Sequence, residues 1–153
     1  MLNYINKDLT TVTGNVIIMH GVNCQDVMGS GVAKALYTKW PQVKRMYHTL
    51  GKVGMHLGMV QVVSVADDPW IFNCFTQEYY GRSRGVVYAS SEAVREVLLK
   101  SCAYAIDMDI TDIYLPRIGC GLGGLDWEKD VLPHLLECTA LYPNINITVC
   151  DHN

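Results

Sequence analysis

The fold is decided by the stretch Val16-Ile17-Ile18-Met19-His20-Gly21-Val22-Asn23-Cys24-Gln25-Asp26-Val27-Met28-Gly29-Ser30-Gly31. Its first five residues form an apolar run rich in β-branched side chains, which is typical of a strand buried on both faces of a sheet. A polar, glycine-bearing loop over residues 21–31 follows, and the pattern of residues 32–39 predicts a helix. This order of strand, loop and helix favours an open α/β sheet, in which ligands bind beyond the carboxyl ends of the strands.

The rest of the chain continues the alternation of strands and helices. Asp67-Asp68-Pro69 has the composition of a turn, so the strands on either side of it are expected to form a hairpin. Pro116 indicates that a strand ends near it, and Pro133 indicates that the last helix starts late or kinks. We therefore expect one α/β domain over residues 1–153, with three layers and a mixed central sheet. The expected strands are residues 2–5, 16–20, 59–65, 70–76, 112–118 and 145–150, and the expected helices are residues 32–39, a piece from Pro41 to Gly51, a helix capped by Ser90 or Ser91, and one that starts near Asp126.

Composition narrows the class of protein. Half of the 153 residues are hydrophobic and 18% are charged, which supports a buried core and excludes a disordered chain. The net charge is −3 and no run of Lys or Arg occurs, so we expect no general nucleic-acid binding. The sequence opens without a signal-peptide pattern and its apolar runs are short, so we expect a cytoplasmic monomer without membrane contact. The six cysteines form no C-x-x-C pair, so we expect reduced thiols, no metal site and no cofactor.

A second glycine-rich loop lies in Arg117-Ile118-Gly119-Cys120-Gly121-Leu122-Gly123-Gly124-Leu125-Asp126-Trp127 and again joins a strand to a helix. Neither loop ends in the Gly-Lys-Ser/Thr of a Walker A loop or has the spacing of a Rossmann fingerprint. In the first loop, the amides of residues 29–31 would stand at a helix N-terminus, where phosphate oxygens bind well. Two such loops could hold a diphosphate between them. The alternative is that both are tight turns without a ligand.

These segments resemble the macrodomain family, and the resemblance covers the whole chain. It is nearest to the branch of the terminal ADP-ribose protein glycohydrolase and the fungal ADP-ribose-1''-phosphate phosphatase. The resemblance implies the three-layer α/β/α macrodomain fold and a cleft above the sheet for ADP-ribose or ADP-ribose-1''-phosphate, with ADP-ribosylated macromolecules as further partners. The matching segments are Lys7-Asp8-Leu9, Met19-His20-Gly21-Val22-Asn23-Cys24, Met28-Gly29-Ser30-Gly31-Val32-Ala33 and Leu115-Pro116-Arg117-Ile118-Gly119-Cys120-Gly121-Leu122.

The resemblance also implies roles for individual residues. Asp8 would bind the adenine amino group with Leu9 beside it, and Asn23 would face the distal ribose. Residues 29–33 and 119–123 would hold the phosphates. Lys7 stands where the family usually has glycine, which is a departure in a surface turn. The ligand-binding residues implied are Asp8, Leu9, Gly21, Val22, Gln25, Met28, Gly29, Ser30, Gly31, Val32, Ala33, Thr76, Pro116, Arg117, Ile118, Gly119, Cys120, Gly121, Leu122 and Gly123.

The chain departs from the branch at its catalytic positions. The protein glycohydrolase uses a lysine and an aspartate, where this chain has Phe75-Thr76-Gln77-Glu78 and Gly123. His20 instead matches a histidine implicated in the phosphatase members. The resemblance therefore implies removal of the 1''-phosphate from ADP-ribose-1''-phosphate, with His20 as general acid or base and Asn23 at the ribose. From its place just after the second loop, Asp126 could orient a water.

Alternatives stay open for the residues and for the function. His20 can instead be held by a backbone carbonyl, and Asp126 can cap the helix that follows it. The second candidate function is a hydrolase that removes ADP-ribose from proteins or nucleic acid, and the third is a non-catalytic ADP-ribose reader. A product assay separates the three, because they release phosphate, ADP-ribose and neither of these, respectively.

Overall fold

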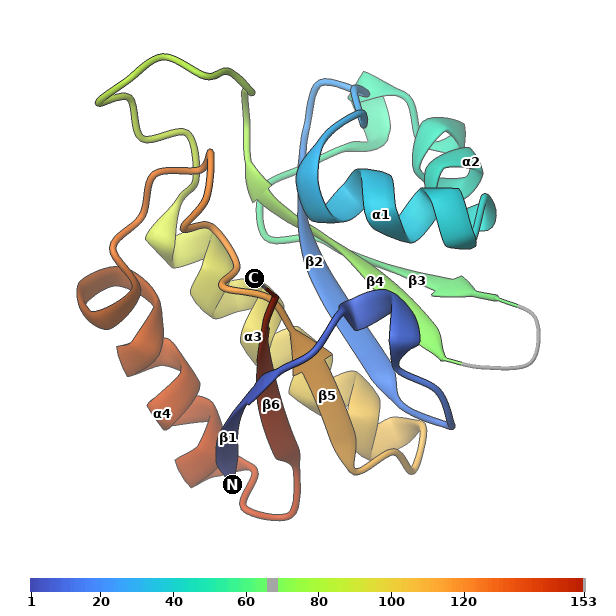
Figure 1. Cartoon of the computed structure of the whole chain (residues 1–153), viewed down its shortest axis with the longest axis vertical. Coiled ribbons are helices and arrows are strands. Elements are labelled where there is room, and N and C mark those ends of the chain that lie inside the picture. Colours follow the sequence, from blue (N-terminus) through green and yellow to red (C-terminus); the bar gives the residue numbers. More distant parts are fainter. Residues whose placement is uncertain (66–68, 153) are drawn as a thin grey trace.

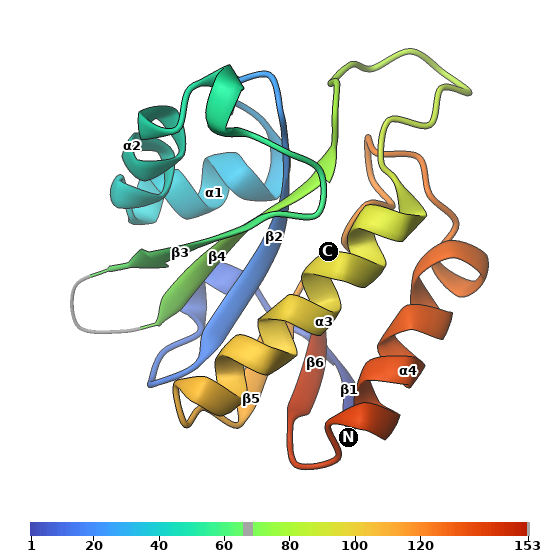
Figure 2. The ribbon, with the colours of Figure 1, turned by 180° about the vertical axis from the view of Figure 1, so that it is seen from behind.

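The computed structural model describes residues 1–65 and 69–152. Figures 1 and 2 show one sheet with helices on both of its faces. Its strands are β1 (Leu2–Asn6), β2 (Ile17–Asn23), β3 (Val60–Ser64), β4 (Trp70–Gln77), β5 (Asp112–Leu115) and β6 (Asn146–Asp151). Its helices are α1 (Gly31–Lys39), α2 (Gln42–Thr49), α3 (Ser91–Asp107) and α4 (Leu132–Leu141), with the short turns η1 (Leu9–Thr11), η2 (Lys52–Gly54) and η3 (Trp127–Val131) between them.

The sheet is mixed, as the sequence predicts. Its strand order is β1-β6-β5-β2-β4-β3, and the pairs within the first five strands are parallel. β3 pairs antiparallel with β4, as expected for a hairpin, although residues 67 and 68 of the expected turn lie outside the described residues. The five parallel strands therefore bring their carboxyl ends to one edge of the sheet, where the loops that follow them meet.

The core is divided between the two faces of the sheet. Because successive side chains of a strand point to opposite faces, Ile17 and Met19 of β2 pack into the cluster under α3 and α4. Ile18 and Val22 pack into the cluster under α1 and α2. Helices thus cover a sheet buried on both faces, which explains the continuous apolar run in β2 and confirms the three-layer α/β arrangement.

Local signals account for most element ends. Ser90 caps α3, because its hydroxyl accepts a hydrogen bond from the amide of Ala93 at 3.1 Å. β5 ends at Leu115, directly before Pro116. Pro133 lies in the first turn of α4, which follows the π-helical turn η3, so the last helix does start late. No helix in the described residues is both long and apolar enough to cross a membrane.

Candidate functional site

Three connections meet at the carboxyl edge of the sheet. Loop 1 (residues 24–30) joins β2 to α1, and loop 2 (residues 116–126) joins β5 to η3. A third connection, which we call the arch (residues 79–87), rises between β4 and α3 beside both loops (Figure 1). Gly21 marks the place where β2, β4 and loop 2 converge. A Cβ on it would lie 2.7 Å from Oγ1 of Thr76 and 3.4 Å from Cγ1 of Ile118.

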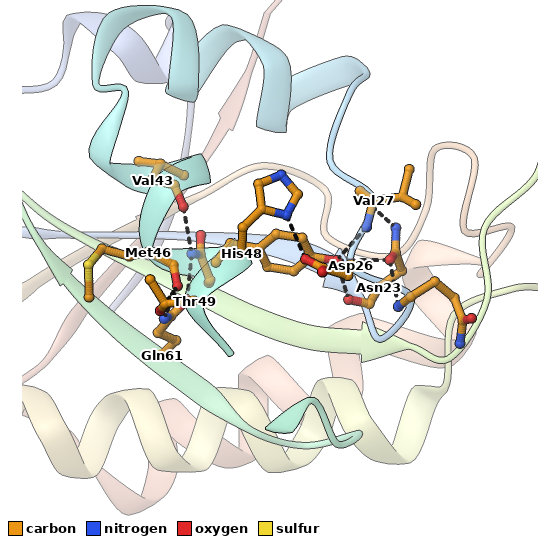
Figure 3. Close-up of polar contacts among 11 residues, drawn as sticks. Asn23, Asp26, Val27, Val43, Met46, His48, Thr49 and Gln61 are labelled. Carbon is orange, nitrogen blue, oxygen red and sulfur yellow. Dashed lines mark hydrogen bonds and ion pairs between the residues drawn. The ribbon is translucent and has the colours of Figure 1, made fainter. Parts of the chain in front are cut away.

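Loop 1 is held by Asn23 and by Tyr47 of α2. Nδ2 of Asn23 donates to the carbonyl of Val27 at 2.7 Å, and its Oδ1 accepts from the amide of Gln25 at 2.9 Å (Figure 3). The hydroxyl of Tyr47 lies 2.8 Å from the Asn23 carbonyl and 2.9 Å from Oδ1, and it accepts from the amide of Val27 at 3.2 Å. The Asn23 side chain therefore fixes the shape of the loop.

The start of loop 1 is pinned from two further sides. Asp26 has a φ of 62°, in the left-handed region, and its Oδ1 lies 2.5 Å from Nδ1 of His48 (Figure 3). Gln25 donates from Nε2 to the carbonyl of Glu78 at 3.1 Å. The side chain of Gln25 is thus turned toward the foot of the arch, while Met28 is buried in the core on the α1–α2 side.

The end of loop 1 presents open backbone at the first turn of α1. Ser30 is the N-cap residue, and its side chain makes no capping hydrogen bond within the described structure. Gly29, Ser30, Gly31 and Val32 are exposed, and a Cβ on Gly29 or Gly31 would have no described atom within 4 Å. Free amides at a helix N-terminus, beside glycines that leave room, form a suitable site for an anionic ligand.

Loop 2 combines buried and open glycines. Gly119 has a φ of 78°, and a Cβ on Gly123 would lie 2.6 Å from the Gly119 carbonyl oxygen, so both positions need glycine for the turn itself. At Gly121, by contrast, a Cβ would meet no described atom within 4 Å. Ile118 is buried, whereas Leu122 is 51% exposed. Gly121 is thus the part of loop 2 where a ligand can approach the backbone.

The residues on either side of the arch, 77–78 and 88–89, which we call its two feet, connect loops 1 and 2. At one foot, the amide of Cys24 donates to the carbonyls of Gln77 and Glu78 at 3.0 and 3.2 Å. At the other foot, the amides of Tyr88 and Ala89 donate to the carbonyl of Gly123 at 2.9 and 3.0 Å. The relative position of the two glycine loops therefore depends on the chain that connects β4 to α3.

Asp8 lies at the opposite end of the same edge, two residues beyond the end of β1. Its Oδ1 accepts from the amide and hydroxyl of Thr10 at 2.9 and 2.8 Å, and these bonds lower the pKa of its carboxyl. Its Oδ2 lies 3.8 Å from Nε2 of His152, and Leu9 beside it is buried. Asp8 is therefore a carboxylate with one oxygen available to a donor on a ligand.

His20 is enclosed in the core, whereas a general acid or base must reach the substrate. Its ring is 1% exposed, and burial lowers its pKa to about 4. Nε2 donates to Oδ1 of Asn73 at 2.5 Å, which leaves Nδ1 without a proton and, among the described residues, without a partner. A neutral ring enclosed in the core fits the alternative of a held histidine, although its partner is a side-chain amide rather than a backbone carbonyl.

Asp126 and Arg117 are both occupied by neighbouring protein groups. Asp126 is the N-cap of η3, where its carboxylate accepts from the amide of Lys129 at 2.9 Å, which fits the helix-cap alternative. Arg117 pairs through Nε and Nη2 with Asp151 at 2.8 and 3.2 Å. Its guanidinium also lies 4.9 Å from the ring centre of Trp127. The Arg117 side chain is therefore held beside β6 and η3.

The cysteines of the two loops are protonated near neutral pH. Burial, together with the neighbouring Glu78 carboxylate, raises the pKa of the Cys24 thiol to about 11. Burial likewise raises the pKa of Cys120. Because a thiolate is the reactive form, neither residue has the character of a nucleophile. In residues 1–65 and 69–152, no three His, Cys, Asp or Glu side chains are grouped in a way that could hold a metal ion.

Two residues of the site were missed by sequence reasoning. Tyr47 was not singled out, although Val43 and Tyr47 at i and i+4 mark the buried face of α2. Glu78 appears in the sequence analysis only within residues 75–78, where the protein glycohydrolase branch would have its catalytic lysine. A signal for it is its place in the chain, since Glu78 directly follows β4 at the carboxyl edge of the sheet, where ligands bind in open α/β folds.

Comparison with known proteins identifies the family. The model of the "Macro domain" family matches residues 19–131. The chain is 26% identical to the DNA ADP-ribosyl glycohydrolase of Mycobacterium tuberculosis, over 97% of this chain but 42% of that protein, so it spans less than half of that relative's length. It is 25% identical to the ADP-ribose glycohydrolase OARD1 of Bos taurus, over 97% of this chain and 90% of that protein.

A solved structure shows the same fold over the full length. The macrodomain protein from Streptomyces coelicolor superposes with a TM-score of 0.81 at 28% identity, covering 100% of both chains. The family match covers most of the described domain, from within β2 to the end of η3, and includes both glycine loops. The chain therefore belongs to the Macro domain family.

Proposed function

We propose that this chain binds ADP-ribose along the carboxyl edge of its sheet and hydrolyses the bond between the distal ribose and an attached group. The observation that carries the proposal is the pair of glycine loops after the neighbouring strands β2 and β5. Each loop offers open backbone, at Gly29 and Gly31 in loop 1 and at Gly121 in loop 2. Membership of the Macro domain family and two relatives named as glycohydrolases support it.

The order of the strands gives the ligand a direction. Asp8 follows β1, loop 2 follows β5, loop 1 follows β2 and Glu78 follows β4, and the strands lie in that order across the sheet. An adenine at Asp8 would place the diphosphate between the two loops. The distal ribose would then lie toward the end of β4, near Glu78 and the arch.

The chemistry at that end requires a positioned water and stabilisation of charge. In the proposed reaction the water oxygen bonds to the anomeric carbon and the water gives up one proton, while the bond to the leaving oxygen breaks and that oxygen takes up one proton, so that the net change is the addition of one water. Backbone amides hold the diphosphate in place, which fixes the ribose next to its nucleophile. We assign the orientation of the water to the exposed carboxylate of Glu78, because Cys24 beside it is protonated and the Asn23 side chain is engaged within loop 1.

Phosphatase activity on ADP-ribose-1''-phosphate is the second candidate function. It needs a proton donor or acceptor at the phosphate, for which the sequence offers His20. Since His20 is enclosed and its pKa is lowered to about 4, it is neutral near pH 7 and out of contact with solvent. A phosphatase would need another proton donor, whereas the glycohydrolase proposal does not use His20.

The first test is binding. Calorimetric titration of ADP-ribose should give a dissociation constant in the micromolar range, which corresponds to about −8 kcal/mol. Gly29→Val should weaken binding strongly, because its side chain would occupy space that no described protein atom fills. Gly54→Ala is the control, since a Cβ there makes an ordinary contact of 3.5 Å with Leu50. Wild-type protein that does not bind ADP-ribose would refute the proposal.

The second test is the product. Glycohydrolase activity releases free ADP-ribose from an ADP-ribosylated substrate, and Glu78→Gln should lower kcat with little change in KM. Glu128→Gln, a matched change of an exposed glutamate in η3, should leave both constants as in the wild type. Phosphate release from ADP-ribose-1''-phosphate alone would favour the phosphatase, and binding without either product would identify a reader.

A further inference from the structure

An open groove lies between the turn η1 and the helix α1. The two elements pack against each other on the face of the sheet that α1 and α2 cover (Figure 1). The groove encloses about 480 Å³, which is within the range of roughly 300–1,000 Å³ that is typical of sites for small molecules. The residues that line it are Thr10, Gly31, Lys34, Ala35, Thr38 and Lys39. Both charged residues of this lining are therefore lysines.

The groove belongs to a basic part of the chain. Residues 27–66, which include α1, α2 and η2, contain no carboxylate, although the whole chain has a net charge of −3. The basic residues in this stretch are Lys34, Lys39, Lys44, Arg45 and Lys52. Only Lys34 and Lys39 are among the residues that line the groove. The surface around the groove therefore favours an anionic ligand, and these two lysines are placed to contact it.

The two lysines keep donors for a ligand. Lys34 is exposed. Nζ of Lys39 donates to the carbonyl of Thr10, which closes one side of the groove and leaves two of the three N–H donors of the ammonium. The lysines are five residues apart, about 7.5 Å along the helix axis, and their flexible side chains can converge on one anion.

One carboxylate, that of Asp8, lies close enough to Lys39 to feel its charge. Hydrogen bonds from Thr10 and, to a smaller extent, the charges of His152 and Lys39 lower the pKa of this carboxyl. Its negative charge is thus partly balanced by protein groups before any ligand arrives. Since Oδ1 is also engaged by the amide and hydroxyl of Thr10, Asp8 opposes an anion in the groove only weakly.

The groove begins where the adenosine ribose of the proposed ligand would lie. Thr10 is bonded to Asp8, which would bind the adenine, and Gly31 is part of the open backbone that would bind the diphosphate. The adenosine ribose connects the adenine to the diphosphate, so it has to pass between Asp8 and Gly31. Because Thr10 and Gly31 both line the groove, a substituent on the 2'-hydroxyl of that ribose can enter it. The distal ribose lies at the other end of the ligand, near Glu78.

We infer that the groove between η1 and α1 is a subsite for a phosphate group on the adenosine ribose, so that the site takes nucleotides of the type of ADP-ribose 2'-phosphate. The inference rests on the proposed function, because binding of the ADP-ribose part is what brings the ribose to the groove. A phosphomonoester carries a charge of about −1.5 to −2 near pH 7. It accepts charge-assisted hydrogen bonds from ammonium groups, and Lys34 and Lys39 supply two of these.

The experiment is calorimetric titration with three ligands: ADP-ribose, ADP-ribose 2'-phosphate, and ADP-ribose with an uncharged methyl group on the same 2'-oxygen. The 2'-phosphate should bind roughly tenfold more tightly than ADP-ribose, which corresponds to about 1.4 kcal/mol. The methylated ligand should gain nothing, because it fills space without charge. The advantage of the phosphate should shrink as the salt concentration is raised, since both lysines are exposed.

Variants of the two lysines test the subsite itself. Lys34→Ala with Lys39→Ala should remove the advantage of the 2'-phosphate and leave the affinity for ADP-ribose at the wild-type value. Lys34→Ala alone keeps the bond from Lys39 to Thr10 and should remove roughly threefold of the tenfold gain. Replacing both lysines by Arg should keep the preference. The charge-matched control is Arg45→Ala with Lys52→Ala, on α2 and η2 and outside the groove lining, which should also keep it.

The outcomes separate this inference from the function on which it rests. Wild-type protein that binds ADP-ribose but gains nothing from the 2'-phosphate would show that the assignment of the groove is wrong. An equal loss in the charge-matched control would overturn it too, because the basic surface as a whole would then attract the anion. So would an equal gain from a second ADP-ribose unit joined through the same 2'-oxygen, since the groove would then hold a nucleotide chain. If the wild type binds none of these ligands, the proposed function itself fails.

Discussion

Tyr47→Phe removes one buried hydroxyl and tests whether α2 shapes loop 1. The hydroxyl donates one proton, shared between the carbonyl and Oδ1 of Asn23, and accepts one from the amide of Val27. The variant therefore loses two hydrogen bonds at a fully buried ring, while the ring keeps its stacking on Phe75 at 5.9 Å. Burial also raises the pKa of this hydroxyl, so it stays protonated as a donor.

The magnitude follows from those two bonds. A net contribution of about 1 kcal/mol for each bond predicts a loss of roughly 2 kcal/mol in the free energy of unfolding. For a domain of this size, that corresponds to a melting temperature lower by roughly 4–8 °C. Because loop 1 leads into the first turn of α1, the loss of its anchor should also weaken ADP-ribose binding.

The assay is urea unfolding at pH 7, with the slope of free energy against urea compared between variants to confirm that the unfolded state is the same. Tyr104→Phe is the control, because Tyr104 is 41% exposed, whereas Tyr47 is fully buried. Calorimetry with ADP-ribose then reports on the loop. A Tyr47→Phe protein as stable as the wild type, with wild-type affinity, would refute the reasoning that these hydrogen bonds determine the loop.

Three further predictions concern other parts of the fold. The pKa of His20 is about 4 in the folded protein and 6.5 in its usual state, so the unfolded chain binds the proton more readily. The free energy of unfolding should therefore fall by about 2–3 kcal/mol as the pH drops from above 6.5 to 4.5. Urea midpoints measure this fall, and His20→Asn is the variant that lacks it. Ser90→Ala should cost about 1 kcal/mol through loss of the α3 cap, read as a thermal shift with Ser64→Ala as control. A double-mutant cycle on Arg117 and Asp151 should give a coupling energy below about 1 kcal/mol that shrinks in high salt, because both side chains are more than one-third exposed. A larger coupling energy would contradict the prediction that this ion pair is weak.

The fold could be predicted because its signals are local and repeated. The apolar run of β2, the serine cap of α3 and the proline after β5 each act within a few residues of the chain. Their sum predicts a mixed three-layer sheet. The end of β2 at Asn23 was harder to predict from the sequence, because pairing with β4 extends the strand three residues beyond its expected end.

The roles of single residues depend on partners distant in the sequence. His20 is neutralised by burial in the core, and its ring is hydrogen-bonded to Asn73, which lies 53 residues away. Arg117 is drawn to Asp151, 34 residues away, and away from the loop in which it stands. No motif or spacing encodes such contacts. The sequence therefore predicts the edge of the sheet where the two glycine loops meet better than it predicts which side chains are free there.

Because the arch is anchored at both ends, changes at its anchors and changes of its exposed side chains have different consequences during evolution. Insertions or deletions at residues 77–78 or 88–89 would shift the two glycine loops relative to each other, because the backbone groups of these residues bind Cys24 and Gly123. Substitutions of the exposed side chains between those anchors alter only what faces solvent. A lineage can therefore exchange the exposed residues of the arch while the two glycine loops keep their relative position.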